Sequence, residues 1–175
     1  MASTVVYTAI FGEYDRLLEV PHEQRRDDVD YICFTDDPSL KSDSFRVVVW
    51  PISQRCPSRE NRDLKINGLR YLADYERSIY IDGNQQITGC LTDLFVNLSD
   101  EKSGLAVFRH SKNNCAYAEA EAVIHRGQDK KSTVLRQMDQ YSSEGFPKNY
   151  GLGWNGLLLR YHTAATRAFC DYWFH

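Results

Sequence analysis

Short apolar runs, rich in β-branched and aromatic residues, alternate along this chain with segments of helical periodicity. The first run, Thr4 to Ile10, is broken by Phe11-Gly12-Glu13-Tyr14-Asp15, and later runs also stop at acidic residues, glycine or proline. Alternation of strand-like and helical segments predicts an α/β fold, in which crossover helices cover a sheet. Functional loops are therefore expected at the ends of the strands.

The expected strands and helices can be given as residue ranges. Strands are predicted at Thr4 to Ile10, Asp30 to Phe34, Phe45 to Trp50, Ser78 to Ile81, Leu105 to Arg109 and Gly156 to Tyr161. Helices are predicted at Arg59 to Tyr75, Leu91 to Leu98, Ala116 to His125, Thr133 to Tyr141 and Thr163 to Phe174. No repeat or low-complexity linker interrupts the 175 residues, so a single domain over residues 1–175 is the simplest expectation.

Composition and charge disfavour several classes of protein. No apolar run approaches the roughly 20 residues of a membrane span, and no signal-peptide pattern follows Met1, which predicts a cytoplasmic protein without a membrane span. The net charge of −3 argues against a nucleic-acid binder. Five scattered cysteines without a C-x-x-C pair indicate reduced thiols rather than a zinc site or a disulfide framework.

The segment Tyr80-Ile81-Asp82-Gly83-Asn84 joins an apolar strand, expected to be central, to two oxygen-bearing side chains. Mg²⁺ and Mn²⁺ prefer oxygen ligands and commonly use one or two carboxylates together with water and substrate phosphates. Asp82 and Asn84 are therefore candidate metal ligands. Asp-Gly between β-rich runs is also a strong hairpin signal, and the local sequence alone favours the hairpin.

Four cations gather at the start of the first long predicted helix: Arg55, Arg59, Arg62 and Lys65. On a helical wheel Arg62 lies close to Ile66, so the basic row leads toward the buried face. A helix N-terminus and arginine side chains both suit a diphosphate. The alternative is a solvated face neutralised by Glu60 and Asp63, and the two interpretations have similar weight.

Further polar and aromatic candidates occur in the second half of the chain. His110 follows a predicted strand, and Glu119 and Glu121 lie on a predicted helix, where residues two apart point to different sides. Trp154 and Asn155 could offer a sugar an aromatic platform and an amide. The alternatives are a structural histidine and a turn with a buried tryptophan. The nucleophile elbow, the Walker loop and the G-x-G-x-x-G fingerprint are absent, which removes common rival chemistries.

Six segments in series resemble a glycosyltransferase-like family once catalogued as domain of unknown function 616, which includes plant proteins named for turgor regulation and mucilage. They span nearly the whole chain and are V-V-Y-T-A-I-F-G-E-Y-D from Val5, D-Y-I-C-F-T-D-D-P from Asp30, N-R-D-L-K-I from Asn61, Y-I-D-G-N from Tyr80, F-R-H with C-A-Y-A-E-A between Phe108 and Ala120, and Q-x-x-x-Y-x-x-E-G-F-P from Gln137. This family is similar to retaining glycosyltransferases of the GT-A type. The resemblance implies a GT-A, Rossmann-like mixed sheet flanked by helices.

The resemblance also implies roles for particular residues. Asp82-Gly83-Asn84 would take the place of the D-x-D motif that holds Mn²⁺ or Mg²⁺ against the donor diphosphate, with asparagine in place of the second aspartate. His110 and Glu119 become candidates on the acceptor side, and Trp154 and Asn155 become candidates for acceptor binding. The first strand and its loop, Tyr7 to Asp15, would contact the nucleoside, and the donor-binding candidates there are Tyr7, Thr8, Phe11, Gly12 and Tyr14. Arg62 and Lys65 would approach the phosphates, and Arg59 is a further donor-binding candidate.

The expected function is transfer of a sugar from a nucleotide-sugar donor to a hydroxyl of a glycan or other acceptor, assisted by the metal and with retention of configuration. Related enzymes carry further residues after the segment equivalent to Trp154 to Leu157, whereas this chain stops at His175. The chain could therefore be truncated, be completed by residues from elsewhere, or bind without turnover. A non-catalytic sugar-nucleotide or glycan binding module and a metal-dependent hydrolase are the alternative functions.

Overall fold

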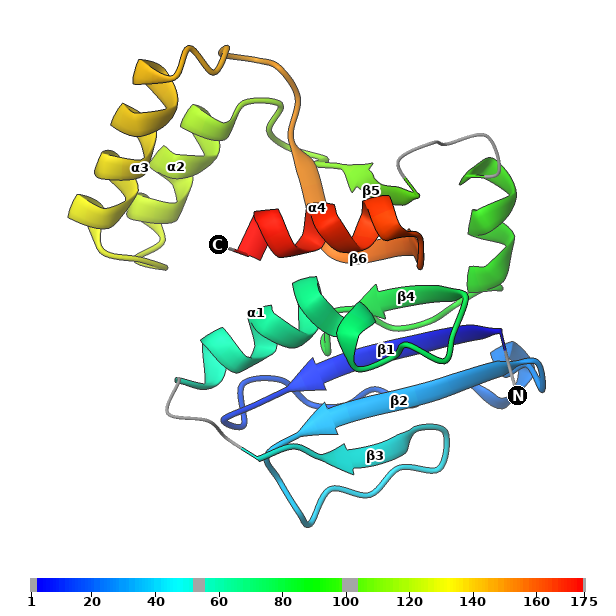
Figure 1. Ribbon diagram of the computed structural model, residues 1–175. Helices are drawn as coiled ribbons and strands as arrows, with labels where there is room; N and C mark the ends of the chain where they lie inside the picture. Colours follow the sequence, from blue (N-terminus) through cyan, green and yellow to red (C-terminus); the bar gives the residue numbers. More distant parts are fainter. Residues whose placement is uncertain (1–2, 52–55, 99–103, 175) are drawn as a thin grey trace. The chain divides into compact units, whose positions relative to one another are not determined.

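The computed structural model of the protein describes residues 3–51, 56–98 and 104–174 (Figure 1). Its strands are β1 Thr4–Ile10, β2 Val29–Thr35, β3 Arg46–Val49, β4 Arg77–Ile81, β5 Leu105–Arg109 and β6 Gly153–Tyr161. Its α-helices are α1 Pro57–Asn67, α2 Ala116–His125, α3 Lys131–Ser143 and α4 Ala164–Phe174, and its 3-10 helices are η1 His22–Gln24, η2 Gly68–Arg70 and η3 Leu91–Leu98.

The six strands form one sheet in the order β3-β2-β1-β4-β6-β5. Strand β2 runs parallel to both β1 and β3, and β1 runs parallel to β4, whereas β6 runs antiparallel to β4. The predicted α/β fold, a mixed sheet flanked by helices, is confirmed, and it is consistent with a Rossmann-like architecture. The predicted central position of β4 is confirmed as well, because β4 lies between β1 and β6.

The chain divides into two compact units, one formed by Met1–Ala106 with Gly156–His175 and the other by Val107–Asn155. The first unit contains β1 to β4, α1 and α4. In the second unit, α2 packs against α3. The expectation of a single domain stays a prediction, because this division says nothing about whether each unit folds alone.

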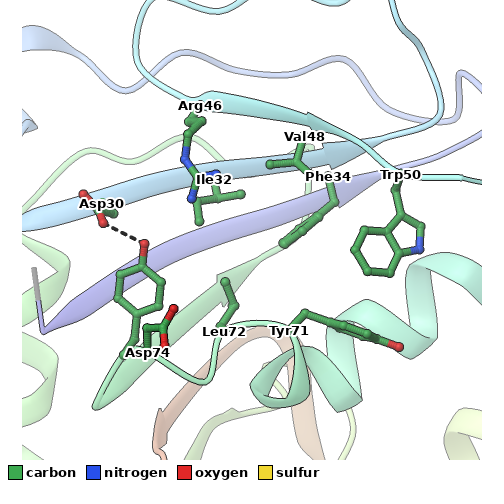
Figure 2. A pocket seen from close by; sticks show the side chains of 10 residues that line it. Asp30, Ile32, Phe34, Arg46, Val48, Trp50, Tyr71, Leu72 and Asp74 are labelled. Carbon is green, nitrogen blue, oxygen red and sulfur yellow. Dashed lines mark hydrogen bonds between the residues drawn. The ribbon is translucent and has the colours of Figure 1, made fainter. Parts of the chain in front are cut away.

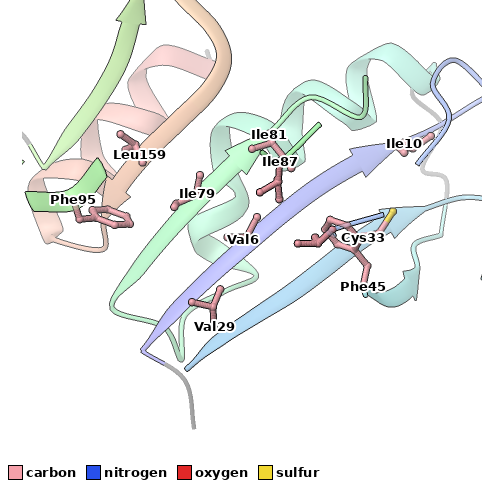
Figure 3. Packing of buried hydrophobic residues seen from close by; sticks show 11 residues of the cluster. Val6, Ile10, Val29, Cys33, Phe45, Ile79, Ile81, Ile87, Phe95 and Leu159 are labelled. Carbon is pink, nitrogen blue, oxygen red and sulfur yellow. The ribbon is translucent and has the colours of Figure 1, made fainter. Parts of the chain in front are cut away.

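Strand β1 forms the centre of the core in the first unit, and every one of its residues is buried. Alternate side chains contribute to two apolar clusters. Val6 and Ile10 belong to a cluster with Phe95 of η3 (Figure 3), whereas Tyr7 belongs to a second cluster with Leu64 of α1. Burial on both faces is typical of a central parallel strand, and it places the end of β1 between two covering layers.

The helix predicted from Arg59 to Tyr75 is wrong in its length, because α1 ends at Asn67 and continues only as the 3-10 turn η2. Distant side chains bind the carbonyl groups of its last turn. The Tyr7 hydroxyl donates to the carbonyl oxygen of Leu64 at 3.0 Å. The Arg160 guanidinium donates to the carbonyl oxygens of Lys65 and Ile66 at 2.9 and 3.0 Å. Contacts from β1 and β6 therefore hold the end of α1.

The hairpin favoured at Asp82-Gly83 by local sequence is also wrong. Neither sheet neighbour of β4 follows it directly in the chain. The amide of Gln85 instead donates to the carbonyl oxygen of Asp82 at 3.0 Å in a turn that leads toward η3. All five cysteines are free. Among the described helices, none is both long and apolar enough to span a bilayer.

Candidate functional site

A cavity of about 550 Å³ with mixed polar and apolar walls lies at the carboxyl ends of β1 and β4. Strands β2 and β3 lie on one side of β1 and β4 lies on the other, so the order of strands reverses here. Open α/β sheets bind their ligands at such a switch point. The cavity is lined by the loop after β1, by α1 and by the turn after β4: Ala9, Ile10, Phe11, Gly12, Tyr14, Asp15, Pro57, Ser58, Asn61, Arg62, Lys65, Asp82 and Asn84.

Asp82, the first residue after β4, is held by two partners. Its Oδ1 atom lies 2.8 Å from Lys65 Nζ and accepts a hydrogen bond of 3.0 Å from the Tyr80 hydroxyl. Burial, followed by the negative charge of Asp82, raises the pKa of Tyr80 well above its usual value. Tyr80 therefore stays a neutral donor to Asp82, and the Lys65 ammonium stands at the cavity wall as an oriented cation.

At Gly83 the backbone lies too close to neighbouring side chains to leave room for a Cβ atom. A Cβ atom at this position would lie 2.9 Å from Cγ1 of Ile10 and 3.0 Å from Cβ of Asp15. The turn after β4 is thereby pressed against the loop after β1, which brings Asp15 near Asp82. Burial and then the charge of Asp82 raise the pKa of Asp15. The charge of Asp82 thus disfavours ionisation of Asp15 in the same cavity.

Helix α1 supplies the cavity with Arg62 and Lys65. Asn61 anchors the same helix to β1, because its side-chain amide donates to the carbonyl oxygen of Ala9. Arg59 is exposed and does not line the cavity. Arg55 lies outside the described residues.

The candidates on β1 and its loop separate into two groups. Phe11, Gly12 and Tyr14 line the cavity, and the amide of Gly12 donates to the Asp36 carboxylate at 3.1 Å. Tyr7 and Thr8, by contrast, have relative exposures of 0% and 1% and lie in the core. Neither can contact a ligand directly from its present position, since burial removes both from the cavity surface. Tyr7 instead supports α1 through the hydrogen bond to Leu64 described above.

The sequence reasoning missed Asn61 as a cavity residue, whereas Asp15 belongs to the segment Tyr7 to Asp15 that the resemblance placed near the nucleoside. Asp15 closes the segment that breaks the first strand, so its position at a strand end was an available signal. Asn61 offered no comparable signal, because its contact with Ala9 joins positions 52 residues apart.

His110 and Glu119 lie together in the second unit. The amides of Lys112 and Asn113 donate to His110 Nδ1 at 3.3 and 2.9 Å, so the proton of the neutral imidazole lies on Nε2. That Nε2 atom is 4.0 Å from Glu119 Oε2. His110 also lines a cavity of about 540 Å³ formed by residues 109–114.

The Glu119 carboxylate is held by charge-assisted contacts. The Asn113 amide and the Arg126 guanidinium both donate to it. Burial acts to raise the pKa of Glu119, but these hydrogen bonds and the Arg126 charge outweigh it and lower the pKa. Glu119 is therefore a weak proton acceptor, and its charge is suited to orienting its neighbours. Glu121 is exposed.

Trp154 and Asn155 belong to β6, so the alternative of a turn around a buried tryptophan is wrong. Trp154 is half-buried and Asn155 is exposed. Neither residue lines the cavity at the ends of β1 and β4. The acceptor-side candidates thus form a set of their own in the second unit.

A family model described as TOD1/MUCI70, glycosyltransferase-like domain, matches residues 57–175, which is more than half of the chain. The chain belongs to this family. The resemblance inferred from the six sequence segments is thereby confirmed. No curated protein matches the chain. The TOD1/MUCI70 match begins at the start of α1, so it includes Arg62, Lys65, Asp82 and Asn84 but not β1 to β3.

Proposed function

We propose that the protein is a nucleotide-sugar-dependent glycosyltransferase that binds the donor diphosphate in the cavity at the ends of β1 and β4. The observation that carries this proposal is the Lys65–Asp82 pair at a sheet switch point, in a chain that belongs to a glycosyltransferase-like family. The volume of about 550 Å³ lies within the usual range for small-molecule sites.

The cations of α1 account for recognition of the leaving group. Lys65 and Arg62 line one wall, and both attract the negative charge that develops on a departing diphosphate. Asp82 holds Lys65 in place before the donor binds, which reduces the reorganisation needed at the moment of reaction. The exposed ring of Tyr14 offers surface to the nucleoside, whereas Phe11 lines the cavity but is almost completely buried.

The oxygen donors in the cavity fit Mn²⁺ or Mg²⁺. Asp82 and Asn84 would hold such a cation, with Asp15, which lines the same cavity, as a further ligand. Within the described ranges no group of three or more His, Cys, Asp and Glu side chains forms a metal cage, so donor phosphate and water would complete the coordination. A bound divalent cation supplies charge neutralisation at the leaving diphosphate.

His110 is the group proposed to accept a proton from the acceptor hydroxyl. Its Nδ1 atom is oriented by two amides, and its Nε2 atom lies 4.0 Å from the Glu119 carboxylate. Trp154 and Asn155 are proposed to contact the acceptor sugar. Transfer with retention of configuration belongs to the same proposal and follows from the resemblance alone.

Thermal unfolding with a panel of nucleoside diphosphates and nucleotide sugars, with and without Mn²⁺, tests the donor site. A ligand at about a hundred times its dissociation constant adds roughly 2.7 kcal/mol, or about 5–10 °C for a chain of this size. Lys65→Met is expected to abolish most of this shift. Lys41→Met removes the same charge from an exposed position outside the cavity and should leave the shift intact. The absence of a shift with every nucleotide would refute the donor site.

Catalysis and metal use need separate measurements. Release of nucleoside diphosphate from a nucleotide sugar distinguishes a transferase from a binding module, which would bind without turnover. Cleavage of a phosphate or amide substrate without any nucleotide-sugar binding would instead favour a hydrolase. If Asp82→Ala binds donor and Mn²⁺ like the parent protein, the metal assignment fails.

A further inference from the structure

A second cavity, of about 280 Å³, lies in the first unit between β2, β3 and the segment after η2 (Figure 2). It shares no lining residue with the cavity proposed for the donor. Its floor is apolar and includes Ile32, Val48 and Leu72. The two ends of the cavity differ in chemistry, because aromatic rings lie at one end and charged side chains at the other.

Trp50 and Tyr71 make up the aromatic end. Their ring centroids are 4.7 Å apart at an interplanar angle of 70°. Phe34 packs edge-on against Trp50 at 5.5 Å, which fixes the indole from the core side. Tyr71 is 41% exposed. The rings are therefore held in place while part of their surface stays open to a ligand.

Asp30, Arg46 and Asp74 make up the charged end, and all three side chains are exposed. The Tyr75 hydroxyl donates to Asp30 Oδ2 at 2.6 Å, so one carboxylate has a fixed orientation. Arg46 supplies hydrogen-bond donors, whereas Asp30 and Asp74 supply acceptors. The cavity thus combines an aromatic wall with both kinds of hydrogen-bonding partner.

We propose that this cavity is a carbohydrate subsite that binds one neutral hexose unit, separate from the donor cavity. A sugar ring presents apolar C–H surface to aromatic rings, and its hydroxyl groups both donate and accept hydrogen bonds. Trp50 and Tyr71 match the first property, and the mixed charges of Arg46, Asp30 and Asp74 match the second. The volume lies just below the usual range for ligand sites, which suits one ring better than a nucleotide.

The charge balance argues against the two other small ligands that such a cavity could take. Two carboxylates oppose an anion such as a nucleotide. A cation would use the carboxylates and the aromatic rings, but it would be repelled by Arg46 and would compete with the Tyr75 hydroxyl for Asp30. A neutral polyhydroxylated ligand uses all of these groups.

Saturation-transfer NMR with methyl glycosides of glucose, galactose and mannose tests the subsite in the full chain. Signal is expected for at least one glycoside with the parent protein. Tyr71→Ala and Asp74→Asn are each expected to weaken binding roughly tenfold, since each removes one kind of contact. Tyr172→Ala, which removes an aromatic ring that is 84% exposed on α4, should bind like the parent. Thermal unfolding of each variant shows that it is folded.

The remaining outcomes decide the proposal. Binding that persists in Lys65→Met supports a subsite independent of the donor cavity, whether or not the proposed transferase function holds. Binding lost in Lys65→Met but kept in Tyr71→Ala and Asp74→Asn would place the sugar in the donor cavity and overturn the proposal. No signal for any glycoside, or equal signal in all variants, would overturn it too. Binding of tetramethylammonium in place of the glycosides would show a cation site.

Discussion

Replacement of Tyr7 by phenylalanine tests whether this residue is structural, as its burial indicates, or binds the donor, as its position in the sequence suggested. The hydroxyl donates to the carbonyl oxygen of Leu64 at 3.0 Å and accepts a hydrogen bond from Arg160. Tyr7→Phe removes one neutral hydrogen bond and deprives a buried guanidinium of a partner. Arg160 keeps its bonds to the carbonyl oxygens of Lys65 and Ile66, which limits the loss.

The expected destabilisation follows from these two losses. A neutral hydrogen bond contributes about 0.5–1.5 kcal/mol and one to a charged group about 1.5–3 kcal/mol, so Tyr7→Phe should cost about 2–4 kcal/mol. At about 2–4 °C per kcal/mol for a chain of this size, the unfolding midpoint should fall by roughly 4–16 °C. Tyr172→Phe removes the same hydroxyl from a side chain that is 84% exposed, and its midpoint should hardly change.

Calorimetric unfolding and titration of the selected nucleotide together decide between the two roles. A structural Tyr7 predicts a lower midpoint for Tyr7→Phe, with nucleotide affinity changed by no more than about threefold, which is under 1 kcal/mol. An unchanged midpoint combined with a large loss of nucleotide affinity would refute the reasoning. That result would show that Tyr7 leaves the core to contact the ligand.

Three further predictions concern packing, acid and thiol reactivity. Gly68→Ala would place a Cβ atom 2.2 Å from Tyr7 Oη, so urea denaturation should show a lower free energy of unfolding. The losses caused by Gly68→Ala and Tyr7→Phe should not add in the double variant, and additive losses would contradict this contact. Burial, with the charges of Arg160 and Arg167, lowers the pKa of His162 to about 4. Because the unfolded histidine, with a pKa near 6.5, binds more protons, stability should be complete above pH 6.5 and fall toward pH 4. The loss is at most about 3 kcal/mol, less after solvent screening, and His162→Gln should flatten this part of the curve. Burial raises the pKa of Cys33 to about 12, whereas hydrogen bonding, chiefly from Ser58, lowers the pKa of exposed Cys56. An aromatic disulfide reagent should therefore modify Cys56 first and Cys33 only after unfolding; rapid labelling of a folded Cys56→Ser variant at Cys33 would contradict this order.

Much of the fold could be predicted because local patterns and tertiary structure agree. The predicted bounds of β1, Thr4 to Ile10, match the structure, since burial on both faces selects an unbroken apolar run. Helix α2 also matches at Ala116–His125. The end of α1 could not be predicted, because apolar residues such as Leu69 and Leu72 continue the helical spacing. What ends the helix is hydrogen bonding from strands that lie far away in the sequence.

Part of the cavity lining could be predicted, because a carboxylate that follows a central strand is expected at the sheet edge where α/β proteins form their cavities. Asp82 and Lys65 lie 17 positions apart, and the structure joins them in one ion pair. Tyr7 shows the limit of this reasoning, because a polar side chain on a central strand can face the core as readily as a ligand. Asn61 shows another limit, since nothing in the sequence distinguishes an asparagine that anchors a helix from one that lies on the surface.

The close packing at Gly83 restricts how this cavity can change through mutation. No side chain fits at position 83, and Asp82 is tied to Lys65 and Tyr80. Substitutions in the turn are therefore best tolerated at Asn84, which is exposed. Among the described contacts, its side chain accepts a hydrogen bond only from the neighbouring Gln85. Asn84→Asp would add a negative charge at little cost to the backbone. Within this turn, position 84 is thus the place at which evolution, or an engineer, could change the cavity without disturbing the fold beneath it.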